Sequence, residues 1–160
     1  MRAINMNHVS VSAYDIENSI RFYEGVFGAQ RIPTPRFAVP VQWLRLGSGQ
    51  LHLFEDAQPA PARAHHFAVT VTVDDFDAIF ATAKSLRVLD GVVFGHHLYE
   101  LPGGEGQMYL RDPGGNLVEV NCAGVAAAGP QVLAEIRKLS DDRPQSEENQ
   151  RARLFLAGSF

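Results

Sequence analysis

The chain carries the same order of elements twice, and this internal repeat restricts its fold more than any other feature. Each half opens with an alternating strand that contains a histidine, continues into an amphipathic helix and ends in further strand-like segments. In the first half, the strand at 7–12 precedes a helix that runs from Asp15 to about Phe27. In the second half, the strand at 66–73 precedes a helix that ends near Leu86. This order predicts an α+β fold of two similar modules.

Both predicted helices carry an apolar stripe that is suited to cover one face of a sheet. Asp15 is the expected N-cap of the first helix, and Gly25 and Gly28 are expected to end it. Asp74 or Asp75 is expected to cap the second helix. The stripes are Ile16, Ile20, Tyr23 and Phe27 in the first helix, and Phe76, Ile79, Phe80 and Ala83 in the second.

Each module ends in a predicted β-hairpin. In the first hairpin, 41–46 pairs with 50–54 across a turn at 47–49. The second hairpin covers 107–121 and turns at 112–116, where proline, glycine and asparagine favour a tight turn. Two further strand-like segments of the second module lie at 92–94 and 97–99.

Strand alternation places one metal-competent side chain from each of four strands on the face opposite the aliphatic residues. Imidazole and carboxylate together suit zinc, iron, manganese, nickel or cobalt. If the helices cover the aliphatic face, the other face of a curled sheet forms a cleft in which two half-sites can meet. The predicted metal ligands are His8 with His52 in one half-site, and His66 with Glu119 in the other.

These residues lie in segments that resemble the vicinal oxygen chelate superfamily, which includes glyoxalase I, the bleomycin resistance proteins and the extradiol dioxygenases. The resemblance covers about 4–122 and implies two βαβββ modules, 1–56 and 64–123, in a domain at 1–123. It also implies a curved mixed sheet around a metal-binding cleft, where the metal chelates two neighbouring substrate oxygens. The segments that carry it are DIENSIRFYEGVFG, QLHLF, HHFAVTV and RDPGGNLVEV.

Likeness to the glyoxalase I branch implies a metal-dependent isomerase or lyase. That branch has a glutamate where His52 stands, and it grips glutathione with an arginine and an asparagine where Ser12 and Asp56 stand. The sequence therefore favours a small substrate other than glutathione. Glu119 or His52 is the candidate catalytic base.

Likeness to the extradiol dioxygenases is the first alternative. That branch binds Fe(II) with two histidines and one glutamate, which correspond here to His8, His66 and Glu119. It also has a catalytic tyrosine ten residues before the glutamate, as Tyr109 precedes Glu119, and an acid/base histidine near the position of His52.

A metal-free binder of aromatic drugs is the second alternative. In such a protein the cleft would be lined by Phe37, Trp43, Phe54 and Tyr99. A protein that only binds drugs does not need four metal-competent residues, so we rank this interpretation third.

The composition bears on the partners and on the cell compartment. A net charge of -4 gives no electrostatic case for binding nucleic acid or an anionic membrane. Cys122 is the only cysteine, which excludes an intrachain disulfide and is compatible with a reducing compartment. No apolar stretch has the length of a membrane span or the pattern of a signal peptide. We therefore expect a cytoplasmic protein. We also expect a homodimer, and the resemblance implies that it acts on a small molecule.

The tail at 124–160 lies outside the repeat and is expected to be helical. An amphipathic helix is predicted from the spacing of Val132, Leu133, Ile136 and Leu139. The polar stretch 141–150 is expected to be solvated, and 153–156 is apolar enough to dock on the body or on a partner subunit.

Overall fold

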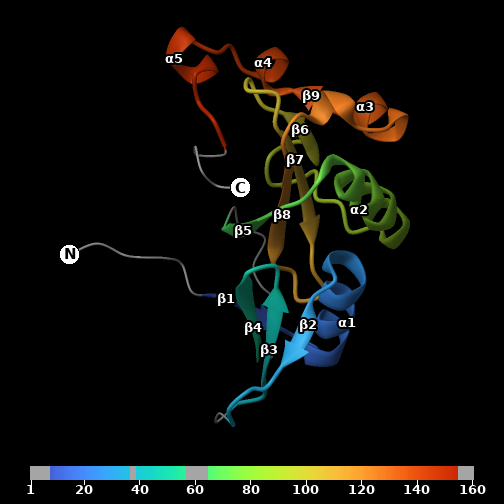
Figure 1. The fold of residues 1–160 in the computed structure, drawn as a ribbon, viewed down its shortest axis with the longest axis vertical. Helices are drawn as coiled ribbons and strands as arrows, with labels where there is room; N and C mark the ends of the chain where they lie inside the picture. Colours follow the sequence, from blue (N-terminus) through green and yellow to red (C-terminus); the bar gives the residue numbers. More distant parts are fainter. Residues whose placement is uncertain (1–7, 37–38, 57–64, 155–160) are drawn as a thin grey trace, which may run out of the picture. The chain divides into compact units, whose positions relative to one another are not determined.

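The computed structural model describes residues 8–36, 39–56 and 65–154. These residues form two compact units (Figure 1). The first unit contains 8–56 together with 111–117, and the second contains 65–110 together with 118–154. Each unit has its own sheet and its own long helix, in agreement with the α+β fold predicted from the repeat. No helix within the described ranges has the length and apolar content needed to cross a membrane.

The first unit has the predicted order of strand, helix and three strands. Its sheet has the strand order β1-β4-β3-β2, with β1 parallel to β4 and the other pairs antiparallel. The predicted hairpin is present, but its turn is tighter than expected because Leu46 already pairs with Gly49. The elements are β1 His8–Ala13, α1 Ile16–Phe27, β2 Gln30–Ile32, β3 Val41–Leu46 and β4 Gly49–Glu55.

Helix α1 begins and ends as its sequence indicates, with one exception. The Asp15 side chain accepts a hydrogen bond from the backbone N–H of Asn18, and Gly28 closes the helix with a φ of 63°. Gly25 was expected to help end the helix, but it lies inside it. The helix buries Ile20 and Tyr23, which belong to the predicted stripe.

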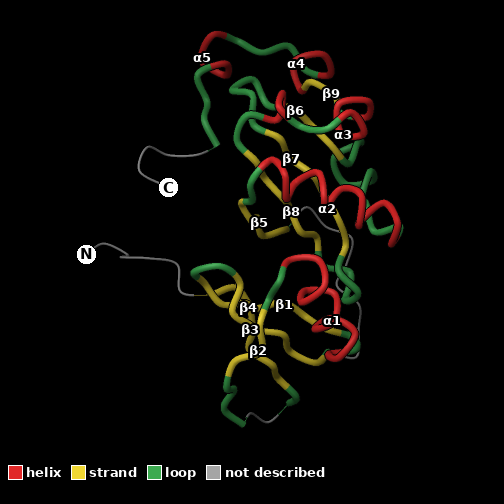
Figure 2. Tube along the Cα trace, turned by 45° about the vertical axis from the view of Figure 1, so that its right-hand side comes forward, coloured by secondary structure: helices red, strands yellow, loops and turns green. Residues whose placement is uncertain are grey.

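The second unit repeats this order and adds a strand from the tail. Its sheet has the strand order β5-β8-β7-β6-β9 (Figure 2). All four residues of the predicted α2 stripe are buried, as expected for a helix that covers a sheet. The elements up to β8 are β5 His66–Thr70, α2 Val73–Leu86, β6 Leu98–Glu100, β7 Gly106–Arg111 and β8 Leu117–Cys122.

Three local predictions in the second unit are wrong. Strand β5 ends at Thr70, and the helix cap is Thr72, whose hydroxyl accepts from the backbone N–H of Asp75. The segment at 92–94 is a loop instead of a strand. Its backbone N–H groups at Val92 and Val93 both donate to the Asp90 carboxylate at 3.0 Å, so they are not available to a neighbouring strand.

The tail does not form the single amphipathic helix that its apolar spacing predicts. Helix α3 (Pro130–Glu135) stops early because Ile136 is extended, and β9 (Arg137–Lys138) then pairs in parallel with β6. Two further short helices follow, α4 (Leu139–Asp142) and α5 (Glu147–Gln150), and a 3-10 turn at Val125–Ala127 precedes α3. Of the segment 153–156, for which docking is predicted, 155–156 lie outside the described residues.

The turn between β7 and β8 is held in the first unit by hydrogen bonds to α1 and β1. The buried Tyr23 hydroxyl donates to the Asp112 carboxylate at 2.7 Å, and the Asn116 amide donates to the backbone carbonyl of Ser12 at 2.6 Å. Gly114 lies so close that a Cβ there would be 2.5 Å from the same carbonyl oxygen. The turn therefore requires glycine at this position. Because β8 follows directly, these contacts also fix where that strand begins.

Candidate metal centre

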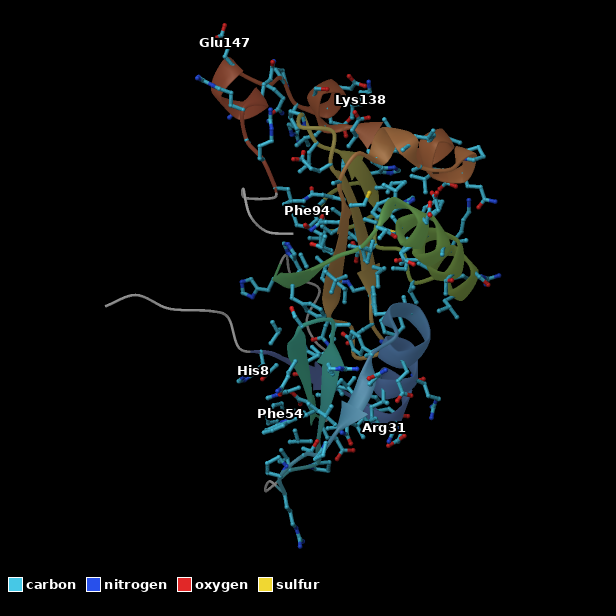
Figure 3. All side chains as sticks on the ribbon, in the orientation of Figure 1. His8, Arg31, Phe54, Phe94, Lys138 and Glu147 are labelled. Carbon is cyan, nitrogen blue, oxygen red and sulfur yellow. The ribbon has the colours of Figure 1, made fainter. Side chains whose placement is uncertain are left out.

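The first predicted half-site consists of His8 and His52, which the sheet brings together. Strands β1 and β4 are parallel neighbours with Ser10 opposite His52, so His8 lies on the same face as His52. The two imidazole rings stack with centroids 4.1 Å apart and an angle of 15° between their planes. Figure 3 labels His8 at the start of β1.

The His52 ring is enclosed on both faces. Trp43 lies opposite it on β3, and the indole stacks on the imidazole at 4.4 Å with an angle of 7°. Nε2 of His52 is 2.9 Å from the amide oxygen of Gln50, and only 6% of the residue is exposed. Burial, together with the nearby His8, lowers the pKa of His52. His52 is therefore a neutral, enclosed imidazole at pH 7.

The second predicted half-site consists of His66 and Glu119, and here a ring nitrogen meets a carboxylate. Nε2 of His66 is 3.2 Å from Oε2 of Glu119, whose side chain is only 5% exposed. The other carboxylate oxygen accepts a hydrogen bond of 2.9 Å from the Gln107 amide. Glu119 is thus held from both sides, by His66 on β5 and by Gln107 on β7.

Tyr109 belongs to the same network. Its hydroxyl donates to the amide oxygen of Gln107 at 3.1 Å. Burial and the negative charge of Glu119 raise the pKa of Tyr109 far above its ordinary value, so the phenol keeps its proton at neutral pH. The ring packs against Phe94 at 4.5 Å and edge-on to His66 at 6.2 Å. Phe94 lies in the loop before β6 (Figure 3) and is 39% exposed.

The structure thus brings the predicted residues together as two pairs, one in each unit. Within the described part of the chain, no group of three or more histidine, cysteine, aspartate or glutamate side chains is arranged so that it could hold a metal ion. A single centre with all four ligands therefore stays a prediction. His65, the neighbour of His66, is exposed.

Two glutamines of the site have no role in the sequence interpretation. Gln50 precedes His52 by two positions on β4, and Gln107 precedes Tyr109 by two positions on β7. In both cases strand alternation places the amide on the face of the predicted site residue. Both glutamines could have been found in the sequence, because each is a polar residue two positions before a predicted site residue on the same strand.

Comparison with known proteins decides the family. The family model described as glyoxalase/bleomycin resistance protein/dioxygenase superfamily matches residues 5–120. The chain belongs to this superfamily. The match covers most of both modules and confirms the resemblance noted in the sequence. The segments that carry the resemblance in the sequence lie on β1, α1, β4, β5 and the β7–β8 hairpin.

One relative of similar sequence is described as a metallothiol transferase. The metallothiol transferase FosB from Lysinibacillus sphaericus is 32% identical over 123 residues, which cover 74% of this chain and 82% of the relative. This degree of similarity places the two proteins in the same family. It does not carry the thiol transferase activity over to this chain.

Solved structures of low sequence identity share the fold. A FosX variant from Listeria monocytogenes, solved with Mn(II) and 1S,2S-dihydroxypropylphosphonic acid, aligns with a TM-score of 0.62 and 15% identity, over 76% of this chain and 94% of that chain. Lactoylglutathione lyase from Agrobacterium tumefaciens aligns with a TM-score of 0.58 and 19% identity, over 79% of this chain and 99% of that chain. The fold of this superfamily is thus common to all of them.

Proposed function

We propose that this superfamily member is a divalent-metal-dependent enzyme, an isomerase or lyase, that acts on a small substrate with two adjacent oxygens. The proposed ligands include His8, His66 and Glu119, and the sequence adds His52 as a fourth. The observation that carries the proposal is the contact of 3.2 Å between Nε2 of His66 and Oε2 of the buried Glu119. A metal-dependent centre also agrees with the names of the metallothiol transferase and of the Mn(II) complex of FosX.

The donor pair in the second unit fits a divalent ion. Two ligand atoms that are each about 2.1 Å from one ion and at right angles to each other lie about 3.0 Å apart. The separation of 3.2 Å between the His66 nitrogen and the Glu119 oxygen is close to that value. One nitrogen and one carboxylate oxygen are also a donor set that manganese, iron, cobalt, nickel and zinc accept. We expect the ion to be one of these five.

The residues around the pair determine what the site does with a substrate. A bound divalent ion supplies a Lewis acid that polarises a substrate oxygen. Gln107 holds Glu119 through one carboxylate oxygen and leaves the other directed at His66. Tyr109 is a neutral phenol whose single hydroxyl hydrogen is donated to Gln107, so it can donate to a substrate oxygen only in exchange for that contact. Phe94 supplies an apolar surface beside it. Gln107, Tyr109 and Phe94 carry no charge, so we expect the part of the substrate beside them to be uncharged.

Glutathione is not the substrate that we propose. The two positions where the glyoxalase I branch has an arginine and an asparagine are Ser12 and Asp56. The Ser12 hydroxyl donates to the Asp56 carboxylate at 3.3 Å. Because a carboxylate repels the two carboxylates of glutathione, this pair disfavours a glutathione conjugate. The expected result is no turnover of the hemithioacetal of methylglyoxal and glutathione by the metal-loaded protein, and turnover would contradict the proposal.

An extradiol dioxygenase is the second candidate, and the position of Tyr109 favours it. This residue is ten positions before Glu119, is 5% exposed and lies edge-on to His66. The identity of the bound metal and the uptake of oxygen distinguish the two candidate functions. Iron in protein purified without chelators, with oxygen uptake on addition of catechol, would support the dioxygenase. Zinc, nickel, cobalt or manganese, without oxygen uptake, would support the isomerase or lyase.

The metal content of variants tests the proposal. Wild-type protein is expected to contain one divalent ion per chain. His66→Ala and Glu119→Gln are expected to lose it while their circular dichroism spectra stay unchanged. His65→Ala, which removes the exposed neighbouring imidazole, is the matched control and should keep the ion. Equal metal content in all four proteins would contradict the assignment, and tight binding of an aromatic drug without any metal would favour the binder.

We also propose that the protein is a cytoplasmic homodimer, as the sequence interpretation expects. Sedimentation equilibrium is expected to give twice the chain mass of 17.6 kDa. A mass of one chain at micromolar concentration would contradict the dimer.

A further inference from the structure

Three aromatic rings from three adjacent strands of the first unit form one continuous stack. Trp43 on β3 stacks on His52 at 4.4 Å, and His52 on β4 stacks on His8 at 4.1 Å. The planes are nearly parallel, with angles of 7° and 15°. Because Trp43 is paired directly with His52, the sheet register itself sets the first contact.

Stacked imidazoles do not suit a shared ion. An imidazole binds a metal through a lone pair in the plane of its ring, at about 2.0–2.1 Å for zinc. Two nearly parallel rings with centroids 4.1 Å apart keep their lone pairs in two separate, nearly parallel planes. One ion cannot lie in both planes at bonding distance, so His8 and His52 do not both bind it in this arrangement.

The surroundings indicate which of the two rings is the ligand. His52 lies between two other rings, is 6% exposed and has its Nε2 at 2.9 Å from the Gln50 amide oxygen. An amide oxygen only accepts hydrogen bonds, so in this pairing Nε2 carries the hydrogen, and the only lone pair left on the ring is that of Nδ1. His8 is the outer ring of the stack and is exposed. The outer ring is the one that an ion can reach.

We propose that His52 is not a metal ligand but a positioning residue that holds the His8 ring in its binding orientation. Trp43 supports the far face of His52, and Gln50 fixes the rotation of its ring. The inference rests on the proposed metal centre and removes His52 from its ligand set. It also gives the single tryptophan of the chain a place in the support of that centre.

Two substitutions of His52 distinguish a metal ligand from a residue that only positions His8. His52→Phe keeps a flat ring of similar size and removes both nitrogens, whereas His52→Ala removes the ring. Isothermal titration with Mn(II) is the measurement, with wild-type protein and His8→Ala as references. His52→Phe is expected to bind one Mn(II) per chain within about threefold of the wild-type affinity. His52→Ala is expected to bind one Mn(II) with about tenfold to hundredfold lower affinity than the wild type. The loss of Mn(II) affinity in His8→Ala is expected to be larger.

The outcomes that overturn the inference are distinct. If His52→Phe loses Mn(II) as completely as His8→Ala, His52 is a ligand and the inference alone fails. If His52→Ala binds as tightly as the wild type, His52 does not position His8. If the wild type binds no Mn(II) or other divalent ion, the proposed function fails, and the inference fails with it. Trp43 fluorescence and near-UV circular dichroism of His52→Phe check that the stack is retained.

Discussion

Gln107 controls the orientation of the carboxylate on which the proposed chemistry depends. Its amide donates to Glu119 and accepts from Tyr109, so one side chain connects the proposed ligand to the proposed hydrogen-bond donor. Mutation of a residue that hydrogen-bonds to a metal ligand typically lowers the metal affinity about tenfold to hundredfold. Their effect is on affinity and not on the number of ions bound.

Replacement of this glutamine tests its role. Gln107→Leu keeps the approximate size of the side chain and removes the amide, so Glu119 loses its second anchor. We expect Mn(II) affinity about tenfold to hundredfold lower in calorimetry, with one ion still bound per chain. Gln131→Leu, at an exposed position of α3, should leave the affinity unchanged. Equal affinities for both variants would show that Gln107 does not orient the carboxylate.

Individual residues also show how far the sequence could predict the site. Strand alternation predicts that His8 and His52 of the first module, and His66 and Glu119 of the second, lie on the face opposite the aliphatic residues, because side chains of one strand alternate strictly between two faces. Alternation says nothing of ring rotation or of amide partners. The stacked rings of the first pair and the glutamine anchor of the second depend on strand register and rotamers, which a single sequence does not reveal.

At the scale of elements, the turn at 111–117 depends on glycine because the β1 backbone is so close. A Cβ at Gly114 would lie 2.5 Å from the Ser12 carbonyl oxygen, and backbone atoms cannot move away easily. Gly114→Ala is therefore expected to lower the free energy of unfolding in urea by about 1–3 kcal/mol. Gly25→Ala is the matched control, since that glycine lies inside α1 with nothing within 4 Å of the added Cβ. It should raise stability by roughly 0.5–1 kcal/mol, and an equal effect of both variants would contradict the close approach.

The hydrogen bond between α1 and this turn makes stability sensitive to alkali. Burial and the nearby Asp112 raise the pKa of Tyr23 well above the ordinary value of 10.0. Below about pH 10 the phenol is protonated in both the folded and the unfolded state and has no effect on the pH dependence. Above it, the unfolded chain loses the proton first, so stability falls by up to about 1.4 kcal/mol per pH unit from this group.

Urea unfolding at about pH 8 and about pH 11 measures this loss, with Tyr23→Phe as the comparison. The variant is expected to be less stable at pH 8, because the buried Asp112 carboxylate loses one of its hydrogen-bond donors. It should nevertheless lose less stability than the wild type between the two pH values. Parallel losses in the two proteins would show that Tyr23 is not responsible.

The elements that the sequence predicted least well are those whose boundaries depend on partners. The apolar spacing across 132–139 fits a helix, but the open edge of β6 pairs with Arg137 and Lys138 and interrupts it. The segment at 92–94 has strand-forming residues, but the Asp90 carboxylate takes its N–H groups. In contrast, α1 ends where its cap residues stand, because capping is decided within a few residues.

At the scale of the whole molecule, metal binding and folding are expected to be linked. An ion that binds only the folded chain adds about 2.7 kcal/mol to the free energy of unfolding when its concentration is a hundred times Kd. Removal of the ion with a chelator should lower the Tm of the wild type and of His65→Ala. It should leave the Tm of His66→Ala unchanged. An equal effect of the chelator on all three proteins would show that the stabilising ion binds elsewhere.

The repeat was sufficient to predict the α+β class, because the class depends on the order of elements and not on exact contacts. The superfamily was indicated by the resemblance of particular segments to its motifs. It does not identify the substrate, which depends on side chains that differ among proteins of one fold. The metallothiol transferase and the lyase that share this fold illustrate that range.

The most direct test of the account is the anomalous diffraction of crystals grown with Mn(II). The account predicts one strong peak per chain, bonded to the side chains of His8, His66 and Glu119, with both nitrogens of His52 beyond bonding distance. The absence of a peak, or a peak that does not contact Glu119, would contradict the proposed centre.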